Sequence, residues 1–153
     1  MSTRAIQFLG KQGVPYGVVK YEHIEKGAEF ASQAIGLPLE QTIKTLVVDV
    51  SPEGPVFLLM PGHVQADMKA LAKALKAKRA ALADTKTAER LTGYLVGGIS
   101  PFGSKKRLPV YMEASLLDHR EVAINGGQRG TLLIMSPRDI LKAASARTIT
   151  VSQ

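Results

Sequence analysis

Strand-like and helix-like segments alternate along the whole chain, and two pairs of strand-like segments are separated only by short turns. Residues 42–50 and 56–60 flank the turn sequence Ser-Pro-Glu-Gly, and residues 121–124 and 131–135 flank a turn that begins Asn-Gly-Gly. These turn residues favour β-hairpins, whose two strands are antiparallel. The alternation predicts an α/β fold, and the hairpins argue against an all-parallel sheet. We therefore expect a single domain built on a mixed sheet flanked by helices.

The clearest helical pattern covers residues 68–75. Its apolar residues, at positions i, i+3, i+4 and i+7, form one stripe and are Met68, Leu71, Ala72 and Leu75. Asp67 can cap the first turn of this helix. Other helices are expected at residues 5–9, 27–35, 84–91 and 136–144, and other strands at residues 15–21, 79–83 and 110–112.

The length of 153 residues is that of one domain, and we expect residues 1–153 to form it. Hydrophobic residues make up 45% and charged residues 22%, which is typical of a soluble globular protein. Cysteine is absent, which excludes disulfides, thiolate metal sites and a cysteine nucleophile. We see no signal-peptide pattern and no apolar stretch long enough to span a membrane, so a cytoplasmic location is expected.

The net charge of +7 favours a polyanionic partner such as a nucleic acid, although a basic protein without such a partner has the same composition. Lys69, Lys73 and Lys76 are expected on one helical face, which could follow a nucleic-acid backbone or could simply be solvated. Aromatic residues make up only 5%, so no stacking platform for single strands is evident.

Two features could carry chemistry. Lys44 shares a strand face with aliphatic residues, so its ammonium either points into a pocket or reaches solvent at the end of the strand. The glycine-rich stretch at residues 97–103 could present backbone N–H groups to an anion, or it could be an ordinary surface turn. The three histidines have no metal-ligand spacing, and neither a GxSxG motif nor a two-carboxylate motif occurs. The residues alone therefore offer no nucleophile, metal site or cofactor motif.

Six segments, in the same order along the chain, resemble segments of one known family. The longest is TGYLVGGISP at 92–101, followed by KKRLP at 105–109; the others are YEH at 21–23, IKTLVV at 43–48, LAKAL at 71–75 and GGQRG at 126–130. Together they resemble the YbaK family of free-standing Cys-tRNA(Pro) deacylases, which is related to the editing domain inserted in bacterial prolyl-tRNA synthetase. The resemblance covers nearly the whole chain.

This resemblance implies a curved mixed sheet flanked by helices, with the pocket between the lysine strand and the loop at 97–101. It also implies trans-editing of Cys-tRNA(Pro), in which the thiol of the substrate attacks its own ester and no cofactor or metal takes part. The catalytic positions that it implies are Lys44, Gly98, Ile99 and Ser100. The implied substrate-binding positions are Tyr21, Thr45, Gly97, Pro101 and Gly127. We expect tRNA, rather than DNA, to contact Lys69, Lys73, Lys76, Lys105, Lys106 and Arg107, and prolyl-tRNA synthetase is a candidate partner.

One position departs from the family pattern. Many members carry an acid two residues after the turn at 126–130, where this chain has Leu132. An acid there could hold the ammonium group of the substrate, so its loss leaves the amino acid open. Alanine or another small amino acid is an alternative substrate, and a module that binds tRNA or a nucleotide without cleaving it is an alternative function.

Overall fold

The computed structural model describes residues 2–25 and 27–153. The described strands form two sheets. The smaller sheet is antiparallel and has the order β1 (Gly17–Lys20), β7 (Thr131–Met135) and β6 (Val122–Asn125). The larger sheet is mixed and has the order β4 (Arg79–Leu82), β2 (Ile43–Ser51), β3 (Gly54–Pro61), β5 (Val110–Glu113) and β8 (Arg147–Ile149). The α/β class and both hairpins are confirmed, β2 with β3 and β6 with β7.

The expectation of one sheet is corrected, because the strands separate into two. An isolated parallel bridge between Thr42 and Ala123 joins the start of β2 to β6. The alternation of apolar and polar residues identifies a strand, but it does not specify which other strand lies beside it. This junction matters for function, because the candidate site lies beside it.

The helices are α1 (Arg4–Gln12), α2 (Ala28–Ile35), α3 (Met68–Ala74), α4 (Thr85–Thr92) and α5 (Pro137–Ala144), with short 3-10 helices η1 (Leu39–Gln41) and η2 (Ala114–Asp118). Each helix expected from the sequence is present. Asp67 caps α3 as predicted, because its side chain accepts a hydrogen bond from the N–H of Ala70 at 3.1 Å. Strand β8 and both 3-10 helices were not expected, since such short segments carry too little pattern to be recognised.

The lysine-rich helical face is a second correction. Helix α3 ends at Ala74, and Lys76 adopts a left-handed backbone conformation with φ of 56°. Lys69 and Lys73 are exposed on the helix, whereas Lys76 belongs to the turn that follows it. The three lysines therefore do not form one helical stripe.

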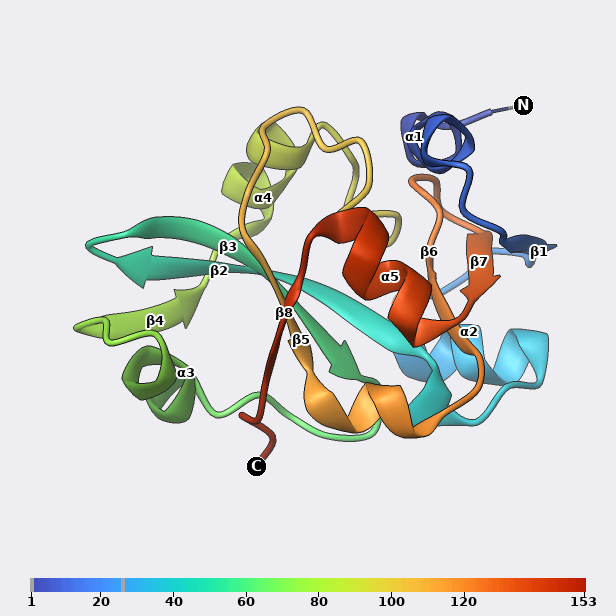
Figure 1. Ribbon diagram of the computed structural model, residues 1–153. Helices are drawn as coiled ribbons and strands as arrows, with labels where there is room; N and C mark the ends of the chain where they lie inside the picture. The colour runs from blue at the N-terminus through green and yellow to red at the C-terminus, as the bar shows by residue number, and fades with distance from the viewer. Residues whose placement is uncertain (1, 26) are drawn as a thin grey trace.

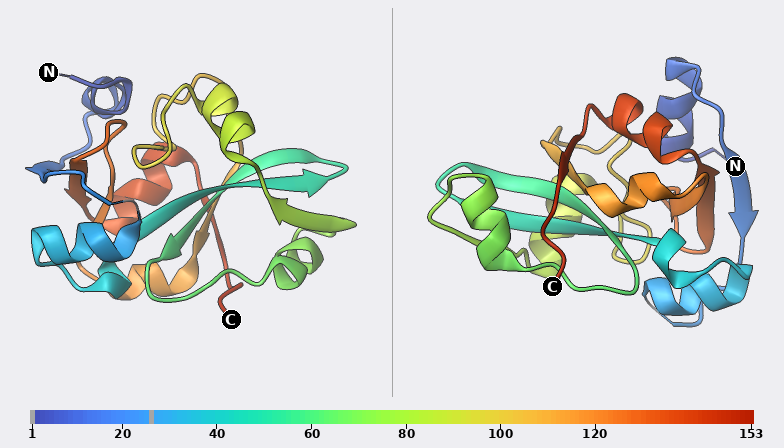
Figure 2. Two further views of the ribbon diagram at one scale, coloured as in Figure 1. Left: turned by 180° about the vertical axis from the view of Figure 1, so that it is seen from behind. Right: turned by 60° about the horizontal axis from the view of Figure 1, so that its bottom comes forward.

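The β2–β3 hairpin runs across the molecule and connects its two ends (Figures 1 and 2). Helix α3 and β4 lie at one end, while α2 and the smaller sheet lie at the other. Strand β3 is buried on both faces: Phe57 and Leu59 contribute to the main core, and Leu58 and Met60 to a second core with Leu71 of α3. Burial on both faces explains the continuous apolar run of this strand.

Among the described residues, no helix combines the length and the apolar character needed to cross a membrane.

Candidate active site

A cavity of about 300 Å³ lies where the start of β2, the N-terminal part of α2 and the loop after α4 meet. Its lining includes Tyr21, Ala31, Lys44, Thr45, Gly97 and Leu132. These residues come from distant parts of the sequence, and four of them belong to the segments that resemble the YbaK family: Tyr21, Lys44, Thr45 and Gly97. The volume is at the lower end of the range for small-molecule sites, about 300–1,000 Å³.

Lys44 lies near the beginning of β2, and its half-buried side chain lines the cavity. Burial lowers the pKa of its ammonium group from the ordinary value of 10.5, because the cavity wall removes water from the charge. A partly desolvated cation interacts more strongly with an oxygen ligand than a fully hydrated lysine does. Lys44 can therefore polarise a carbonyl or hold a ribose or phosphate oxygen.

Tyr21 follows β1 and forms part of the cavity wall beside α2. Its ring packs against Phe30 of α2, with ring centroids 6.2 Å apart, and its N–H donates to the carbonyl of Gly130 at 2.9 Å. Burial raises the pKa of the Tyr21 phenol, and a backbone hydrogen bond with Gly130 partly offsets the rise. The phenol therefore stays protonated near neutral pH and can donate a hydrogen bond to a substrate oxygen.

Gly97 also lines the cavity, in a conformation that favours glycine, with φ of 99°. A Cβ at this position would lie 3.0 Å from Cε1 of His23 and 3.3 Å from Cγ of Arg129. The absence of a side chain thus lets the Gly97 backbone pack closely against His23 and Arg129 while it lines the cavity. A backbone so placed can contact a ligand closely.

Gly98 packs this loop against the turn at 126–130. A Cβ on Gly98 would lie 2.8 Å from the carbonyl carbon of Gln128 and 2.9 Å from the backbone N of Arg129. Arg129 also donates from Nε to the carbonyl of Val96 at 2.8 Å. The segments at 92–101 and 126–130, which resemble the family separately, therefore pack directly against each other.

Further contacts hold the same loop to α1 and α4. Glu89 accepts a hydrogen bond from the N–H of Val96 at 2.8 Å, and Arg4 donates to the carbonyl of Thr92 at 2.8 Å. The Arg4 guanidinium lies 5.2 Å from the centre of the Tyr94 ring, whose hydroxyl donates to the carbonyl of Phe102. Sequence reasoning missed Arg4, Glu89 and Arg129. Of these three, only Arg129 could have been found from the sequence, since it belongs to the family-like segment at 126–130.

The remainder of the cavity combines apolar walls with one polar atom that lacks a partner. Ala31 is 4% exposed and Leu132 is 1% exposed, and both belong to one small apolar cluster. The Oγ1 atom of Thr45 is buried and has no hydrogen-bond partner among the described residues. Leu132 lines the cavity at the position where many family members carry an acid, and the described lining contains no Asp or Glu. A small side chain with one polar atom fits such a space.

The structure does not bring all the predicted positions to this cavity. Ile99 and Ser100 are 6% and 0% exposed, and the Ser100 hydroxyl accepts from the N–H of Phe102 at 3.1 Å. Pro101 lines a different cavity. A Cβ on Gly127 would meet the ring of Tyr94 at 2.9 Å. Substrate contacts by the backbone from Gly98 onward and by Gly127 remain predictions.

The predicted tRNA contacts fall into two groups. Lys105, Lys106 and Arg107 are exposed and directly follow the loop of the cavity. Lys69 and Lys73 are on α3, which lies at the other end of the molecule from α2 (Figures 1 and 2). We therefore expect a short RNA strand bound at the cavity to reach Lys105, Lys106 and Arg107 more easily than the lysines of α3. No group of three or more metal-binding side chains occurs among the described residues.

Comparisons with known proteins identify the family. The model of the aminoacyl-tRNA editing domain family matches residues 23–143. EbsC of Enterococcus faecalis, provisionally named a Cys-tRNA(Pro)/Cys-tRNA(Cys) deacylase, is 31% identical over 147 residues, covering 95% of this chain and 90% of EbsC. ProXp-y of Escherichia coli, named a multifunctional Ser/Thr-tRNA deacylase, is 30% identical over 150 residues, which cover 95% of this chain and 89% of ProXp-y.

The fold agrees as well. A crystal structure described as a candidate trans-editing enzyme for prolyl-tRNA synthetase superimposes with a TM-score of 0.89 at 26% identity, covering 98% of this chain and 95% of that chain. The family model spans most of the chain, including Lys44 and the loop at Gly97 and Gly98. By sequence and by fold, this protein belongs to the aminoacyl-tRNA editing domain family.

Proposed function

We propose that this protein is a trans-acting deacylase that releases a small amino acid from tRNA, with cysteine on tRNA(Pro) as the preferred substrate. The class of activity, aminoacyl-tRNA deacylation, follows from family membership. The observation that carries the proposal is the convergence of Lys44, Tyr21 and the Gly97 backbone on one small cavity. Such a reaction would take place in the cytoplasm, where charged tRNA is found.

In this proposal the chain binds and orients the ester instead of supplying a nucleophile. The Lys44 ammonium and the Tyr21 phenol hold oxygens of the terminal ribose and the ester, and the negative charge that develops on the carbonyl oxygen is stabilised there. The cysteinyl thiol attacks its own carbonyl carbon, so a C–S bond forms as the ester C–O bond breaks. The thiol proton ends on the ribose hydroxyl of the released tRNA, and water then opens the resulting thioester ring.

The cavity supports a small substrate side chain. Ala31 and Leu132 provide apolar walls, and rotation of the Thr45 side chain about χ1 would bring its buried, unpaired Oγ1 to a thiol or hydroxyl in the cavity. Because a buried polar atom without a partner destabilises the folded state, a substrate that satisfies Thr45 gains binding energy that alanine does not. The match with EbsC favours cysteine among the candidates.

Serine is the second candidate, and the same Thr45 oxygen favours it. A seryl hydroxyl is a better hydrogen-bond partner than a thiol, and ProXp-y carries the name of a Ser/Thr-tRNA deacylase. A serine substrate cannot use thiol attack as readily, so its release would require water or a tRNA hydroxyl as the nucleophile.

A panel of charged tRNAs tests the proposal and separates the candidates. Purified protein is incubated with Cys-tRNA(Pro), Ala-tRNA(Pro), Ser-tRNA and Thr-tRNA, and the remaining ester is measured over time. We expect Cys-tRNA(Pro) to be cleaved fastest, and S-alkylation of its cysteine to stop release. Faster release of serine would establish the second candidate. Intact esters on all four tRNAs, together with tight tRNA binding, would instead indicate a non-catalytic binding module.

Thr45→Val tests recognition of the side chain. Valine keeps the shape of threonine but removes the unpaired oxygen, so we expect release of cysteine to slow by about 3–10-fold and release of alanine to stay unchanged. The thermal midpoint should not fall, because the variant removes a buried polar atom that has no partner. Equal slowing for both amino acids would show that Thr45 does not contact the substrate side chain.

Salt dependence of tRNA binding tests the basic residues beside the cavity. We expect Lys105→Ala and Lys106→Ala each to weaken binding of uncharged tRNA(Pro) and to reduce the slope of log Kd against log salt concentration by about 1, as loss of one phosphate contact does. Lys69→Ala and Lys73→Ala remove the same charge from α3 and provide the comparison. A larger effect from α3 would place the RNA along that helix. Co-purification of prolyl-tRNA synthetase with the wild-type protein would test that enzyme as a partner.

A further inference from the structure

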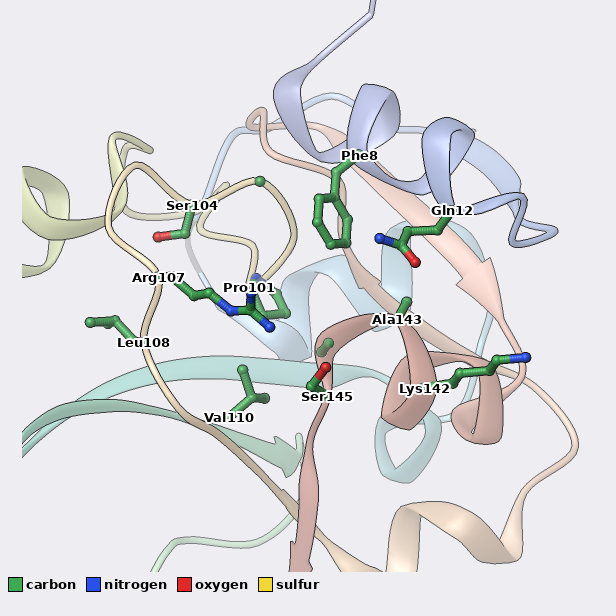
Figure 3. Close-up of a pocket in the computed structure, with 12 residues that line it drawn as sticks. Phe8, Gln12, Pro101, Ser104, Arg107, Leu108, Val110, Lys142, Ala143 and Ser145 are labelled. Carbon is green, nitrogen blue, oxygen red and sulfur yellow. The ribbon is translucent and has the colours of Figure 1, made fainter.

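A second cavity, of about 310 Å³, lies on the other side of the loop that borders the candidate active site. It is bounded by α1, by the segment from Pro101 to Val110 and by the last turn of α5 (Figure 3). Gly97 lines the first cavity and Pro101 the second, and the three residues between them are buried. The segment at 97–101 therefore separates the two cavities, which have no lining residue in common.

The chemistry of this cavity differs from that of the first. Phe8 and Val110 supply an apolar wall, and Val110 is 6% exposed, whereas the Leu108 side chain points away from the cavity into the main core (Figure 3). Phe8 stacks on Phe102 with ring centroids 6.2 Å apart and an interplanar angle of 18°, which fixes the orientation of its ring. A flat apolar group of a ligand can pack against such a wall.

One cation points into the cavity. The exposed Arg107 side chain extends towards Pro101, and Figure 3 shows its guanidinium on the cavity side, whereas the Lys142 ammonium at the rim points away. The described lining contains no Asp or Glu that could neutralise Arg107. A guanidinium with free N–H groups in this setting is suited to bidentate binding of a phosphate.

Polar groups on the remaining sides of the cavity favour a ligand that has hydrogen-bonding groups in addition to a phosphate. The Gln12 amide and the Ser145 hydroxyl line the cavity, and the last turn of α5 ends there, whereas the Ser104 hydroxyl donates to the carbonyl of Lys106 at 2.8 Å. The carbonyls of Leu141 and Lys142 already accept hydrogen bonds from Ala146 and Ser145, so the carbonyls of Ala143 and Ala144 are those that can accept from amino or hydroxyl groups of a ligand. The ligand should thus combine an anion, a flat apolar ring and hydrogen-bond donors.

We propose that this second cavity binds a 5′-nucleotide unit, with the phosphate on Arg107 and the base against Phe8 and Val110. The unit can be a free mononucleotide or one residue of an RNA strand, since both present the same phosphate, ribose and base. None of the residues that line this cavity lines the candidate active site, so the proposal stands apart from deacylation, although Arg107 is also an expected tRNA contact and Pro101 an expected substrate contact.

NMR titration of ¹⁵N-labelled protein with adenosine 5′-monophosphate tests this binding. Adenosine and inorganic phosphate, the two parts of the nucleotide, are titrated separately for comparison. We expect amide shifts in the segments around Ser104 and Ser145, and an affinity at least about tenfold higher for the nucleotide than for either half. A trinucleotide RNA identifies the source: tighter binding than the mononucleotide indicates an RNA strand, and weaker binding indicates a free nucleotide. Shifts confined to the surroundings of Lys44, or none at all, would overturn the proposal.

Matched variants confirm the location. Arg107→Gln should weaken nucleotide binding by about tenfold, the loss expected for one charge-assisted contact. Arg138→Gln removes the same charge from the first turn of α5, outside the described lining, and should leave the affinity unchanged. Ala144→Leu fills the cavity and should abolish the shifts around Ser104, with circular dichroism confirming the fold. Unaltered binding by Arg107→Gln would contradict the assignment even if Ala144→Leu failed to fold.

Discussion

Lys44→Met should lower kcat/KM for deacylation by about 10²–10³-fold, the range found when one stabilising donor for a developing oxyanion is removed. Methionine has a length similar to that of lysine and preserves the packing of β2, but it has no charge to place beside the ester. Because Lys44 is the one charged side chain in the described lining of this cavity, we expect no neighbouring residue to replace it.

The same variant should be at least as stable as the wild type at neutral pH. Burial lowers the pKa of Lys44 in the folded state, so the folded state binds the proton less tightly than the unfolded state does. Stability therefore rises with pH between the lowered pKa and the unfolded value near 10.5, and below that window the desolvated charge destabilises the fold. Lys44→Met removes this penalty. Wild-type activity should fall as pH rises through the lowered pKa of Lys44, because the ammonium is lost.

Lys86→Met is the control for Lys44→Met, since it removes one exposed positive charge from α4, away from the described cavity linings. Its activity should equal that of the wild type. Lys44 would be excluded from the site if Lys44→Met retained full turnover of every tRNA that the wild type cleaves. A large drop in its thermal midpoint would instead assign the lysine a structural role.

Gly98→Ala should lower the free energy of unfolding by about 1–3 kcal/mol, the usual effect of forcing extra volume into a packed region. The added Cβ would lie within 3.0 Å of the Gln128 backbone, which cannot move aside as the end of a flexible side chain could. The loop at 96–98 or the turn at 126–130 must then shift. Because Gly97 forms the cavity wall, deacylation should fall with stability, and denaturant unfolding together with the tRNA assay measures both effects.

Gly10→Ala provides the matched control for Gly98→Ala. Gly10 lies within α1, and no atom lies within 4 Å of the position of its added Cβ. Alanine is preferred to glycine inside a helix, so this variant should be more stable by about 0.5–1 kcal/mol and fully active. Equal stabilities of the Gly98→Ala and wild-type proteins would show that the packing of the loop on the turn is looser than the structure indicates.

Local patterns were sufficient for most secondary structure. The helix after Asp67, the helix after Ser136 and both hairpins form where the sequence predicted them, because capping, apolar periodicity and turn residues act within a few positions. The pattern did not reveal the end of α3 before Lys76 or strand β8. Strand β8 depends on its pairing with β5, a distant segment. Helix α3 ends in a local turn, in which the N–H of Ala77 donates to the carbonyl of Ala72 at 2.8 Å and Lys76 takes the left-handed conformation that usually favours glycine.

The candidate site was predicted in part. Resemblance to a family pointed to Tyr21, Lys44 and Gly97, and the structure places all three at one cavity. It did not distinguish Gly97, which lines the cavity, from Ser100, which is buried behind it with its hydroxyl bonded to the next turn of the chain. Adjacent residues in an irregular loop point in unrelated directions, so their spacing in the sequence cannot show which of them line the cavity.

The sequence by itself determined the α/β class, the hairpins, the absence of a cysteine nucleophile and the segments that identify the family. Tertiary structure alone decided that the strands form two sheets and that Leu132 lines the cavity. It also decided that Arg107 faces a second cavity, and that the loop at Gly98 is held by the turn at 126–130. The physical reason is that capping and periodicity act within a few residues, whereas cavities and their walls arise from packing between segments far apart in the chain.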